Sequence, residues 1–375
     1  MRLVFLYTAA LSLVLAGCST SGASDVSVSE SELSLSYLDS ITVPDGTAPF
    51  DVPFGGISGI DYDAESGRFL ATSDDRSEKG PARFYELELP VDDSGKFGAL
   101  DVTAMTVYFR SDGVPFPAKG VDPESIRHVP GSTDVLVSSE GDASKVLAPF
   151  ISRFSGNGSF LRDYTIPAAY VPDVAGTNGV RNNLAFEGLT YSVDGSRITA
   201  LTENALVQDG PGASVGEVSH SRAVVFDAGS GAVDAEYVYD IDPIGESYPD
   251  VVDATGYTLK ADRGATEILA IDDTDYLVVE RGLIPGRGNT VQVYRASTAR
   301  ASDVAGKSAL DGGETSMAKT LLFDFAVTGE NPDNVEGISW GPTLPDGTRT
   351  LVLCADDNFN AAGGQHTKFH LLAVR

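Results

Sequence analysis

The sequence repeats one β-hairpin pattern five times, and this repeat restricts the possible folds more than any other feature. Each copy has an acidic or serine residue, a short apolar strand, a polar turn, a second apolar strand and a closing acid. The copies run from Ser58 to Asp74, Glu124 to Glu140, Glu187 to Glu203, Glu267 to Glu280 and Glu336 to Asp356. A supersecondary unit repeated in this way is typical of solenoids and propellers.

The turns test whether the five copies are aligned correctly. If the two acidic ends of a copy face each other across an antiparallel pair, their midpoint must fall on a turn. The midpoints fall in segments 64–67, 130–133, 193–196, 272–275 and 345–348. These segments are rich in Gly, Pro, Asp and Ser, which favour turns. All five copies are therefore predicted to be hairpins.

Further strands with alternating apolar residues raise the number of strands per repeat to four. They are predicted at 83–89, 102–109, 150–154, 160–166, 223–228, 233–241, 290–295 and 319–325. The fifth repeat has only three strands and ends with 368–374, and residues 33–43 can supply its fourth. A strand from the N-terminal part that completes the last blade hides the edges of a circular array. We therefore predict an all-β fold, a five-bladed β-propeller formed by residues 33–375, with a sixth blade in 242–264 as the alternative.

The N-terminal segment has the features of an export signal. Arg2 is followed by an apolar run from Leu3 to Ala16, which is too short to span a bilayer as a helix and typical of a signal-peptide core. The run ends in Leu-Ala-Gly before Cys18, which resembles a bacterial lipobox. We predict removal of residues 1–17, lipidation of Cys18 and a flexible tether over 18–32. The alternative is an ordinary cleaved secretory peptide.

The acidic composition limits the possible partners. The chain has 26 Lys and Arg against 54 Asp and Glu, a net charge of −28. This charge repels nucleic acid and anionic lipid, so we expect no nucleic-acid partner and membrane contact only through the lipid on Cys18. Cys354 is the only other cysteine, which excludes an internal disulfide after lipidation. We expect an exported, lipid-anchored monomer in the bacterial cell envelope.

The repeat predicts that acids from distant segments meet at one end of the propeller channel. The first strand of each blade lines the channel, and the antiparallel second strand ends at the same mouth. The first-strand set is Ser58, Glu124, Glu187, Glu267 and Glu336, and the second-strand set is Asp74, Glu140, Glu203, Glu280 and Asp356. Two like charges about 5 Å apart repel by roughly 3 kcal/mol at an effective dielectric of about 20.

A bound cation would compensate this repulsion. Carboxylate and hydroxyl oxygens with no His–Cys cluster favour Ca²⁺ over Mg²⁺ or Zn²⁺. We therefore predict a calcium site formed by the first-strand set. The alternative is that these acids accept hydrogen bonds from loop N–H groups and hold no metal.

Basic residues recur near the same mouth of the predicted channel. Six of them are candidate substrate-binding residues: Arg76, Lys119, Lys145, Arg181, Arg263 and Arg281. Because the chain has few cations, their gathering here favours recognition of an anion such as a phosphate. The alternative is that they form ordinary ion pairs with the neighbouring acids.

Several ordered motifs resemble a known family. They are the segments that begin at Gly56 (GISGIDYD), Asp122 (DPESIR), Phe186 (FEGLT) and Val335 (VEGIS). Over residues 50–375 the chain resembles the "esterase-like activity of phytase" family of exported bacterial proteins. This resemblance implies a phytase-like propeller associated with phosphoester hydrolysis. The ring of one Ser and four Glu is also similar to the central calcium site of five-bladed calcium-dependent apyrases.

The leading hypothesis is a calcium-dependent phosphoester hydrolase that acts on a small phosphorylated substrate at the channel mouth. The metal would polarise the phosphoryl group and the basic residues would hold the anion. One acid of Glu140, Glu203, Glu280 and Asp356 would act as the general base. The alternatives are a non-catalytic binding propeller with a structural calcium ion, and a glycosidase that uses paired carboxylates.

Overall fold

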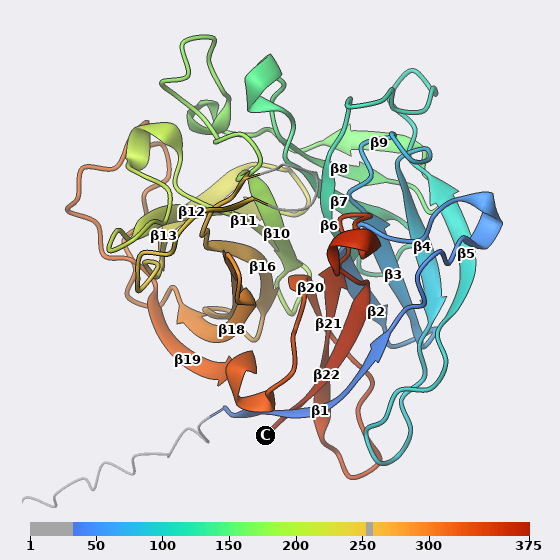
Figure 1. The fold of residues 1–375 in the computed structure, drawn as a ribbon. Helices are drawn as coiled ribbons and strands as arrows, with labels where there is room; N and C mark the ends of the chain where they lie inside the picture. Colours follow the sequence, from blue (N-terminus) through green and yellow to red (C-terminus); the bar gives the residue numbers. More distant parts are fainter. Residues whose placement is uncertain (1–32, 253–257) are drawn as a thin grey trace, which may run out of the picture. The chain divides into compact units, whose positions relative to one another are not determined.

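The computed structural model describes residues 33–252 and 258–375. Five antiparallel sheets of four strands each are arranged in a ring around a central axis (Figure 1). The prediction of a five-bladed β-propeller is confirmed. The predicted signal segment, Cys18 and the tether lie outside the described residues.

Each blade is one meandering sheet whose first strand lies nearest the axis. Blade 1 contains β2 (Ile57–Asp63), β3 (Arg68–Ser73), β4 (Arg83–Glu88) and β5 (Asp101–Val107). Blade 2 contains β6 (Pro123–His128), β7 (Val135–Ser139), β8 (Phe150–Phe154) and β9 (Phe160–Asp163). Blade 3 contains β10 (Phe186–Tyr191), β11 (Arg197–Thr202), β12 (Ser219–Asp227) and β13 (Val233–Ile241). Blade 4 contains β16 (Gly264–Ala270), β17 (Asp275–Ile284), β18 (Gly288–Ser297) and β19 (Ala318–Asp324).

Blade 5 combines the two ends of the described chain. It contains β20 (Asn334–Trp340), β21 (Arg349–Asp356), β22 (Lys368–Val374) and, at its outer edge, β1 (Leu35–Thr42). β1 pairs antiparallel with β22 from Leu35 opposite Val374 to Thr42 opposite Lys368. The predicted closure by an N-terminal strand is confirmed (Figure 1).

The alternative of a sixth blade is wrong. Within 242–264, the described residues form only a two-stranded ribbon of β14 (Val251–Val252) and β15 (Thr258–Leu259).

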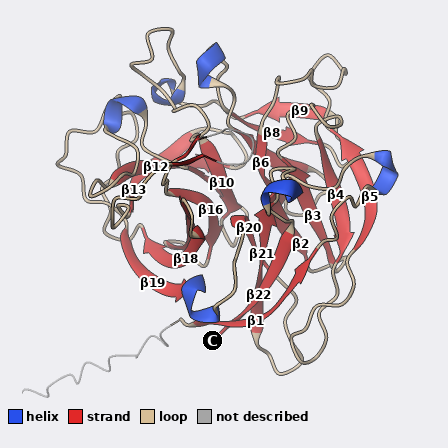
Figure 2. Cartoon of the chain, in the orientation of Figure 1, coloured by secondary structure: helices blue, strands red, loops and turns tan. Residues whose placement is uncertain are grey.

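Strands dominate the fold, and the helices are single turns in the connecting loops (Figure 2). They are the 3₁₀ turns η1 (Pro49–Asp51), η2 (Ala143–Lys145), η3 (Ala168–Tyr170), η4 (Val207–Asp209), η5 (Phe325–Thr328) and η6 (Ala361–Gly363). In the part of the chain that the structure describes, none of these turns has the length and apolarity needed to cross a bilayer.

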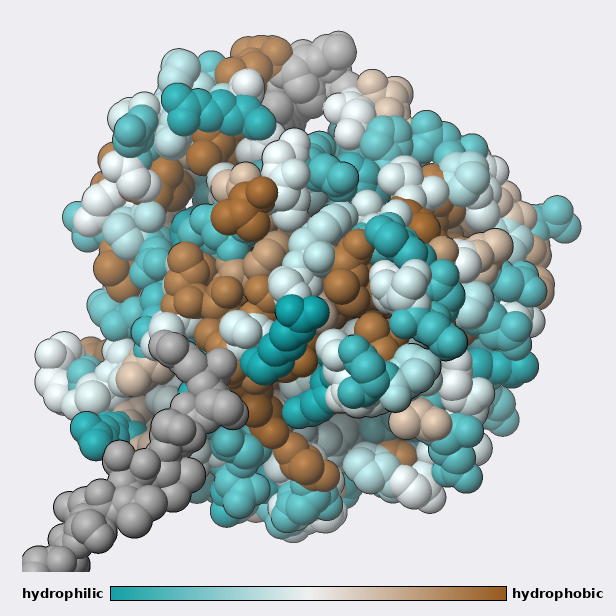
Figure 3. Space-filling view, turned by 90° about the horizontal axis from the view of Figure 1, so that it is seen from below, coloured by the Kyte–Doolittle hydropathy of each residue, from teal (hydrophilic) through white to brown (hydrophobic). Residues whose placement is uncertain are grey.

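Apolar residues of neighbouring blades form the core between the sheets. One residue of each first strand lies fully buried at the same level: Ile60, Ile126, Leu189, Ile268 and Ile338. Aromatic side chains fill the wider space further out, as in the stacked pair of Tyr170 and Phe186. Seen from below the view of Figure 1, apolar side chains also gather over the middle of the surface, with polar side chains around them (Figure 3).

Every first strand has a β-bulge near its start, and this bulge matters for the channel. The register shifts after Ile57, Pro123, Phe186, Ala265 and Val335. A bulge adds a residue that has no partner across the strand pair and re-aims a side chain. After the bulge, three blades have a glycine that lies against the next blade. A Cβ atom on Gly59 would lie 2.6 Å from the Glu124 carbonyl oxygen, so no larger residue fits there.

A single arginine fills the channel axis. The buried guanidinium of Arg127 in β6 lies 2.9 Å from Glu267 Oε2. It also donates hydrogen bonds to one backbone carbonyl of each of the other four blades: Ile60 (2.5 Å), Leu189 (2.6 Å), Ile338 (3.1 Å) and Ile268 (3.4 Å). Arg127 therefore ties all the first strands together and separates the two mouths of the channel.

Candidate metal centre

Eight carboxylic acids gather at the mouth of the channel where the first strands begin. We call this group the acidic mouth: Asp74, Asp122, Glu124, Glu140, Glu187, Glu203, Glu336 and Asp356. The bulges of β6, β10 and β20 contribute Glu124, Glu187 and Glu336. Most of the other acids lie at or just after the end of a second strand, as predicted from antiparallel pairing. The five-fold arrangement thus brings together acids more than 200 residues apart in the sequence.

Two groups of three acids in this mouth have ligand atoms close enough to share one cation. Asp122, Glu124 and Glu140 form one group, and Glu140, Glu187 and Glu203 form the other. Within each group the carboxylate oxygens lie within 4.8 Å of one another. All five residues are buried, and Glu140 belongs to both groups. The acidic residues could therefore hold a metal ion.

Few hydrogen-bond donors face these acids. Ser58 Oγ donates to Glu124 Oε2 at 2.7 Å, and Asn334 Nδ2 donates to Glu336 Oε1 at 2.8 Å. Glu140 Oε1 accepts a short hydrogen bond from the backbone N–H of Ala185. Asp356 Oδ1 likewise accepts a hydrogen bond from the backbone N–H of Asn358 at 2.8 Å. The alternative of loop N–H groups in place of a metal thus applies to Glu140 and Asp356, but not to the acidic mouth as a whole.

Two arginines compensate only part of the negative charge. Arg281 lies 3.3 Å from Glu336 Oε1 and 3.5 Å from Glu203 Oε1. Arg76 lies 3.3 Å from Asp122 and 3.0 Å from Asp142, which is outside the cluster. Among the described residues, these two cations face eight carboxyl groups, so ion pairing alone leaves most of the acids without compensation.

The pKa values of these acids reflect the shortage of compensating positive charge. Burial raises the pKa of Asp122 to about 7, an effect that Arg76 opposes. Burial likewise raises the pKa of Glu140 and of Glu203 to about 8. The charge of Glu203 adds to the rise at Glu140, whereas the charge of Arg281 opposes the rise at Glu203. Burial and nearby carboxylates also raise the pKa of Asp74, Glu124, Glu187 and Asp356 well above their usual range, and burial raises that of Glu336. Without a cation, these acids prefer to keep their protons at neutral pH.

In blade 4 the structure does not bring Glu267 to this mouth. The bulge of β16 falls at Thr266, which occupies the position that Glu187 occupies in β10. Glu267 follows the bulge and is fully buried deeper in the channel, where it pairs with Arg127. It also accepts hydrogen bonds from Ser125 Oγ (2.7 Å) and the Leu189 N–H (2.7 Å). Burial raises its pKa to about 7, against the opposing charge of Arg127.

Glu280, the predicted second-strand acid of blade 4, is also one position away from the acidic mouth. Glu280 pairs with the residue before the bulge, so Arg281 stands where blade 3 has Glu203. Glu280 instead accepts bonds from Tyr239 Oη (2.7 Å) and Lys319 Nζ (2.5 Å) and lies 2.6 Å from the Arg263 guanidinium. The first-strand residues around the mouth are therefore Ser58, Glu124, Glu187, Thr266 and Glu336. In blade 4 the second strand contributes the positively charged side chain of Arg281 in place of an acid.

The six predicted substrate-binding residues separate into two sets. Arg76 and Arg281 contact the acidic mouth, and Lys145 reaches Asp142, the second partner of Arg76, at 2.6 Å. Lys119 instead pairs with the exposed Glu78 at 3.3 Å. Arg181 donates to the carbonyls of Ala205 and Gly210, and Arg263 pairs with Glu280.

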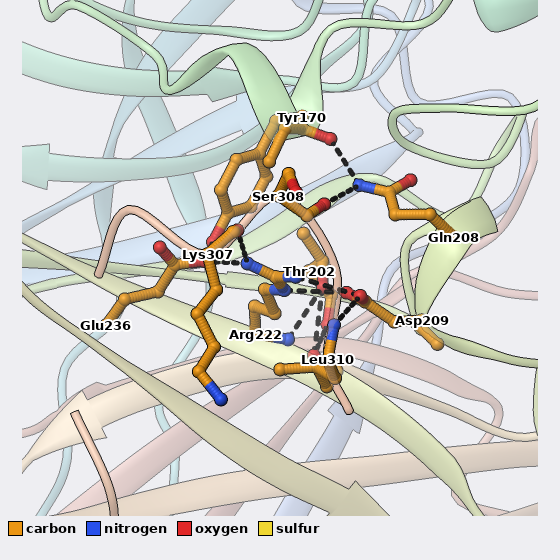
Figure 4. Close-up of polar contacts among 12 residues, drawn as sticks. Tyr170, Thr202, Gln208, Asp209, Arg222, Glu236, Lys307, Ser308 and Leu310 are labelled. Carbon is orange, nitrogen blue, oxygen red and sulfur yellow. Dashed lines mark hydrogen bonds and ion pairs between the residues drawn. The ribbon is translucent and has the colours of Figure 1, made fainter. Parts of the chain in front are cut away.

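A buried network supports the loop that follows Glu203 (Figure 4). Arg222 in β12 donates to both oxygens of Asp209, at 2.6 and 2.8 Å, and to Glu236 at 2.9 Å. Its backbone N–H donates to Thr202 Oγ1 at 3.2 Å. In blade 1, Arg83 makes the equivalent contact with Asp75, the residue after Asp74, at 2.6 Å. These pairs fix the backbone on which two acids of the mouth are placed.

Three residues of the site were not predicted from the sequence. They are Asp122, Thr266 and Asn334. Asp122 could have been predicted, because it lies two residues before Glu124 in an acidic motif. Thr266 and Asn334 have no such signal, because a hydroxyl or amide next to an acid is common in any loop.

Comparison with known proteins identifies the family. Residues 52–359 match the family described as phytase-like, "esterase-like activity of phytase", and the chain belongs to this family. The resemblance predicted from the sequence motifs is thereby confirmed.

A curated relative and solved structures are also similar to this chain. An "uncharacterized secreted protein" of Arthroderma benhamiae is 26% identical over 62% of this chain, and the match spans about half (48%) of that relative. An endo-arabinase of Bacteroides thetaiotaomicron is 12% identical, covering 86% of this chain and 95% of its own, with a TM-score of 0.45. The catalytic domain of an α-L-arabinofuranosidase of Coprinopsis cinerea is 11% identical, covering 91% and 96%, with a TM-score of 0.42.

Proposed function

We propose that this protein is a calcium-dependent phosphoester hydrolase whose site is the acidic mouth. One observation carries the proposal: eight carboxyl groups, seven of them buried and Asp74 half-buried, converge where, among the described residues, only two arginines compensate them. Burying like charges together is unfavourable unless a cation or protons neutralise them. Membership of a phytase-like family supports hydrolysis of a phosphate ester as the reaction.

The donor set fits calcium. Both groups of three acids offer only carboxylate oxygens, with a serine and an asparagine side chain nearby. Oxygen-only sites with several carboxylates suit a hard cation with a flexible coordination shell, whereas zinc prefers N and S ligands. Asp122, Glu124, Glu140, Glu187 and Glu203 would hold the ion, with Glu140 in the central position.

The residues of the mouth outside the two groups of three would supply the other parts of the reaction. When bound, the ion supplies Lewis acidity toward the phosphoryl oxygens. Arg281 and Arg76 orient the substrate anion through their guanidinium N–H groups. Asp356 lies outside both groups of three, and it would accept the proton of the attacking water once the positive charge of the bound ion has ionised its carboxyl group. Of the four acids predicted as the base, Glu280 is bound in its own ion pairs and is the least suited.

The test is a screen of phosphomonoesters and phosphodiesters with the purified protein, in added calcium or after treatment with EDTA. We expect turnover that EDTA abolishes and calcium restores. Glu187→Gln should lose the calcium-dependent turnover and Arg281→Gln should raise KM, whereas Glu65→Gln, an exposed acid on a hairpin turn, serves as the matched control. The absence of metal-dependent turnover on every substrate would overturn the proposal.

A second candidate is a binding propeller in which calcium only stabilises the fold. The deep burial of the five candidate ligands favours it, because a fully enclosed ion has no open position for a substrate. This candidate predicts calcium binding and calcium-dependent stability in a protein without turnover, so the same screen separates the two.

We also propose export with a lipid anchor on Cys18. The lipobox-like segment before Cys18 and the secreted relative support this proposal. Mass spectrometry of the protein purified from a bacterial membrane should find residue 18 as a lipidated N-terminus, and Cys18→Ser should release the protein from the membrane. An unmodified Cys18 would refute the anchor and leave the proposed hydrolysis untouched.

A further inference from the structure

The opposite mouth of the channel holds a second cavity, which the proposed hydrolysis does not use. We call it the Trp340 cavity; its volume is about 420 Å³. The lining residues that matter here are Asp61, Arg127, His128, Tyr191, Trp340 and Arg349. Arg127 forms its inner end and fills the axis, so the cavity is separate from the acidic mouth. A concave site of this size with aromatic walls and a few polar groups is typical of small-molecule binding.

The lining of the cavity includes a histidine whose orientation is fixed by hydrogen bonds. Asp61 Oδ2 accepts hydrogen bonds from the backbone N–H of His128 at 2.8 Å and from its ring Nδ1 at 2.9 Å. A carboxylate bonded to Nδ1 places the proton of the neutral ring on that nitrogen. Nε2 is then a hydrogen-bond acceptor, and no described residue donates to it. The His128 ring is therefore held in one orientation, in which Nε2 can accept a hydrogen bond from a ligand hydroxyl.

The lining also includes an arginine that has no anionic partner among the described residues. The guanidinium carbon of Arg349 lies 3.6 Å from the centre of the Trp340 ring, and this stacking fixes the guanidinium plane. Among the described residues, none forms an ion pair or a hydrogen bond with this guanidinium. The carboxylate that lines the cavity, Asp61, is already bonded to His128 and to Ser339 Oγ (3.5 Å). Arg349 is exposed and has no acid beside it among the described residues, in a chain with twice as many acids as bases, so its stacked guanidinium is available to bind an oxyanion.

We propose that the Trp340 cavity binds a small hydroxylated anion, such as a sugar acid or a sugar phosphate. Arg349 would bind the carboxylate or phosphate with two parallel N–H groups. His128 Nε2 would accept a hydrogen bond from a hydroxyl group of the same molecule. This site is independent of the calcium site at the acidic mouth.

The single tryptophan of the chain makes this proposal directly testable, because Trp340 fluorescence reports on the cavity alone. The probes are D-glucuronate, D-glucose 6-phosphate, inorganic phosphate and neutral D-glucose, titrated in EDTA and followed by fluorescence and by calorimetry. We expect saturable binding of the first two probes, weaker binding of phosphate and none of glucose. Arg349→Gln should weaken binding by about tenfold or more, since a charge-assisted pair is lost. His128→Gln should weaken binding of the hydroxylated anions and leave phosphate unchanged.

Two control variants separate this site from the rest of the molecule. Arg300→Gln removes an exposed arginine outside the cavity, and Glu187→Gln alters the acidic mouth; both should bind the probes like the native protein. The absence of saturable binding by both methods, or equal binding by Arg349→Gln and the native protein, would overturn the proposal. Loss of binding in Glu187→Gln would contradict the separation of the two sites.

Discussion

Calcium binding to the acidic mouth should release at least two protons per ion at pH 7. Carboxylates must lose their protons to bind a metal, so binding competes with protonation. At pH 7, a group whose pKa is about 8 is about 0.9 protonated and one whose pKa is about 7 is about 0.5 protonated. Glu140 and Glu203 belong to the first kind and Asp122 to the second. Each group of three also contains Glu124 or Glu187, whose pKa is raised well above the usual range.

The direction of the pH effect follows from these pKa values. Calcium binds the deprotonated carboxylates, so its apparent affinity rises with pH, by about a hundredfold per pH unit near pH 7 when two protons are released. The rise should flatten above about pH 9, where Glu140 and Glu203 have lost their protons.

Calorimetric titration in buffers of different ionisation enthalpy measures the released protons directly. Glu140→Gln should release about one proton fewer and bind calcium more weakly, because Glu140 belongs to both groups of three. The control Glu65→Gln, on an exposed turn, should behave like the native protein. A calcium affinity that stays constant between pH 6 and 8, with no proton release, would refute the reasoning about the buried acids.

Three further predictions concern stability. Arg127→Met should lower the free energy of unfolding by about 3–5 kcal/mol in urea denaturation, because it leaves Glu267 buried without its partner; Arg300→Met, on the surface, should cost less than about 0.5 kcal/mol. Asp209→Asn should cost at least about 2 kcal/mol, since Arg222 keeps its charge but loses a bidentate partner, and equal stability of variant and native protein would contradict this role. Burial lowers the pKa of His370 from its ordinary value of 6.5 to about 4. The stability that the neutral, buried His370 ring contributes is therefore complete above pH 6.5, and up to about 3 kcal/mol of it is lost as the pH falls toward 4. The stability difference between native protein and His370→Gln, measured in urea across this range, should shrink as the pH falls, and a difference independent of pH would count against the buried neutral histidine.

Most of the fold could be predicted from the sequence because the repeat is local. Each hairpin has its own turn residues and its own alternating strands, and these features lie within about 20 consecutive residues. The strand at 33–43 could be placed because a circular array needs a partner for its last blade. The predicted strands lie within a few residues of those in the structure, as for 150–154 and 368–374.

The site of blade 4 could not be predicted correctly for a geometric reason. The hairpin test uses only the midpoint between two residues, and the pair Glu267 and Glu280 has the same midpoint as the pair Thr266 and Arg281. Moving one residue outward at both ends keeps the turn in place and exchanges the faces of both side chains. Only the position of the bulge separates the two alignments, and a bulge depends on contacts with the neighbouring blade.

The position of Arg127 on the channel axis could not be predicted from the sequence for a related reason. Its hydrogen-bond acceptors are backbone carbonyls, which every residue carries, and they lie in four other blades. Its ionic partner, Glu267, is 140 residues away in the sequence. No spacing rule connects such residues, because propeller closure alone brings them together.

The departure of blade 4 from the repeat has a consequence for the chemistry of the acidic mouth. Four blades place an acid at the second-strand position, and a fifth acid there would add to a group that already prefers to hold protons. Arg281 instead places a fixed positive charge within 3.5 Å of Glu203 and Glu336 and opposes the rise of their pKa values. The same charge repels a cation from blade 4 and attracts an anion to it. The ring is therefore asymmetric, with the candidate cation ligands on the side of blades 2 and 3 and a fixed positive charge in blade 4, and this asymmetry supports the proposed metal-assisted hydrolysis of a phosphate ester.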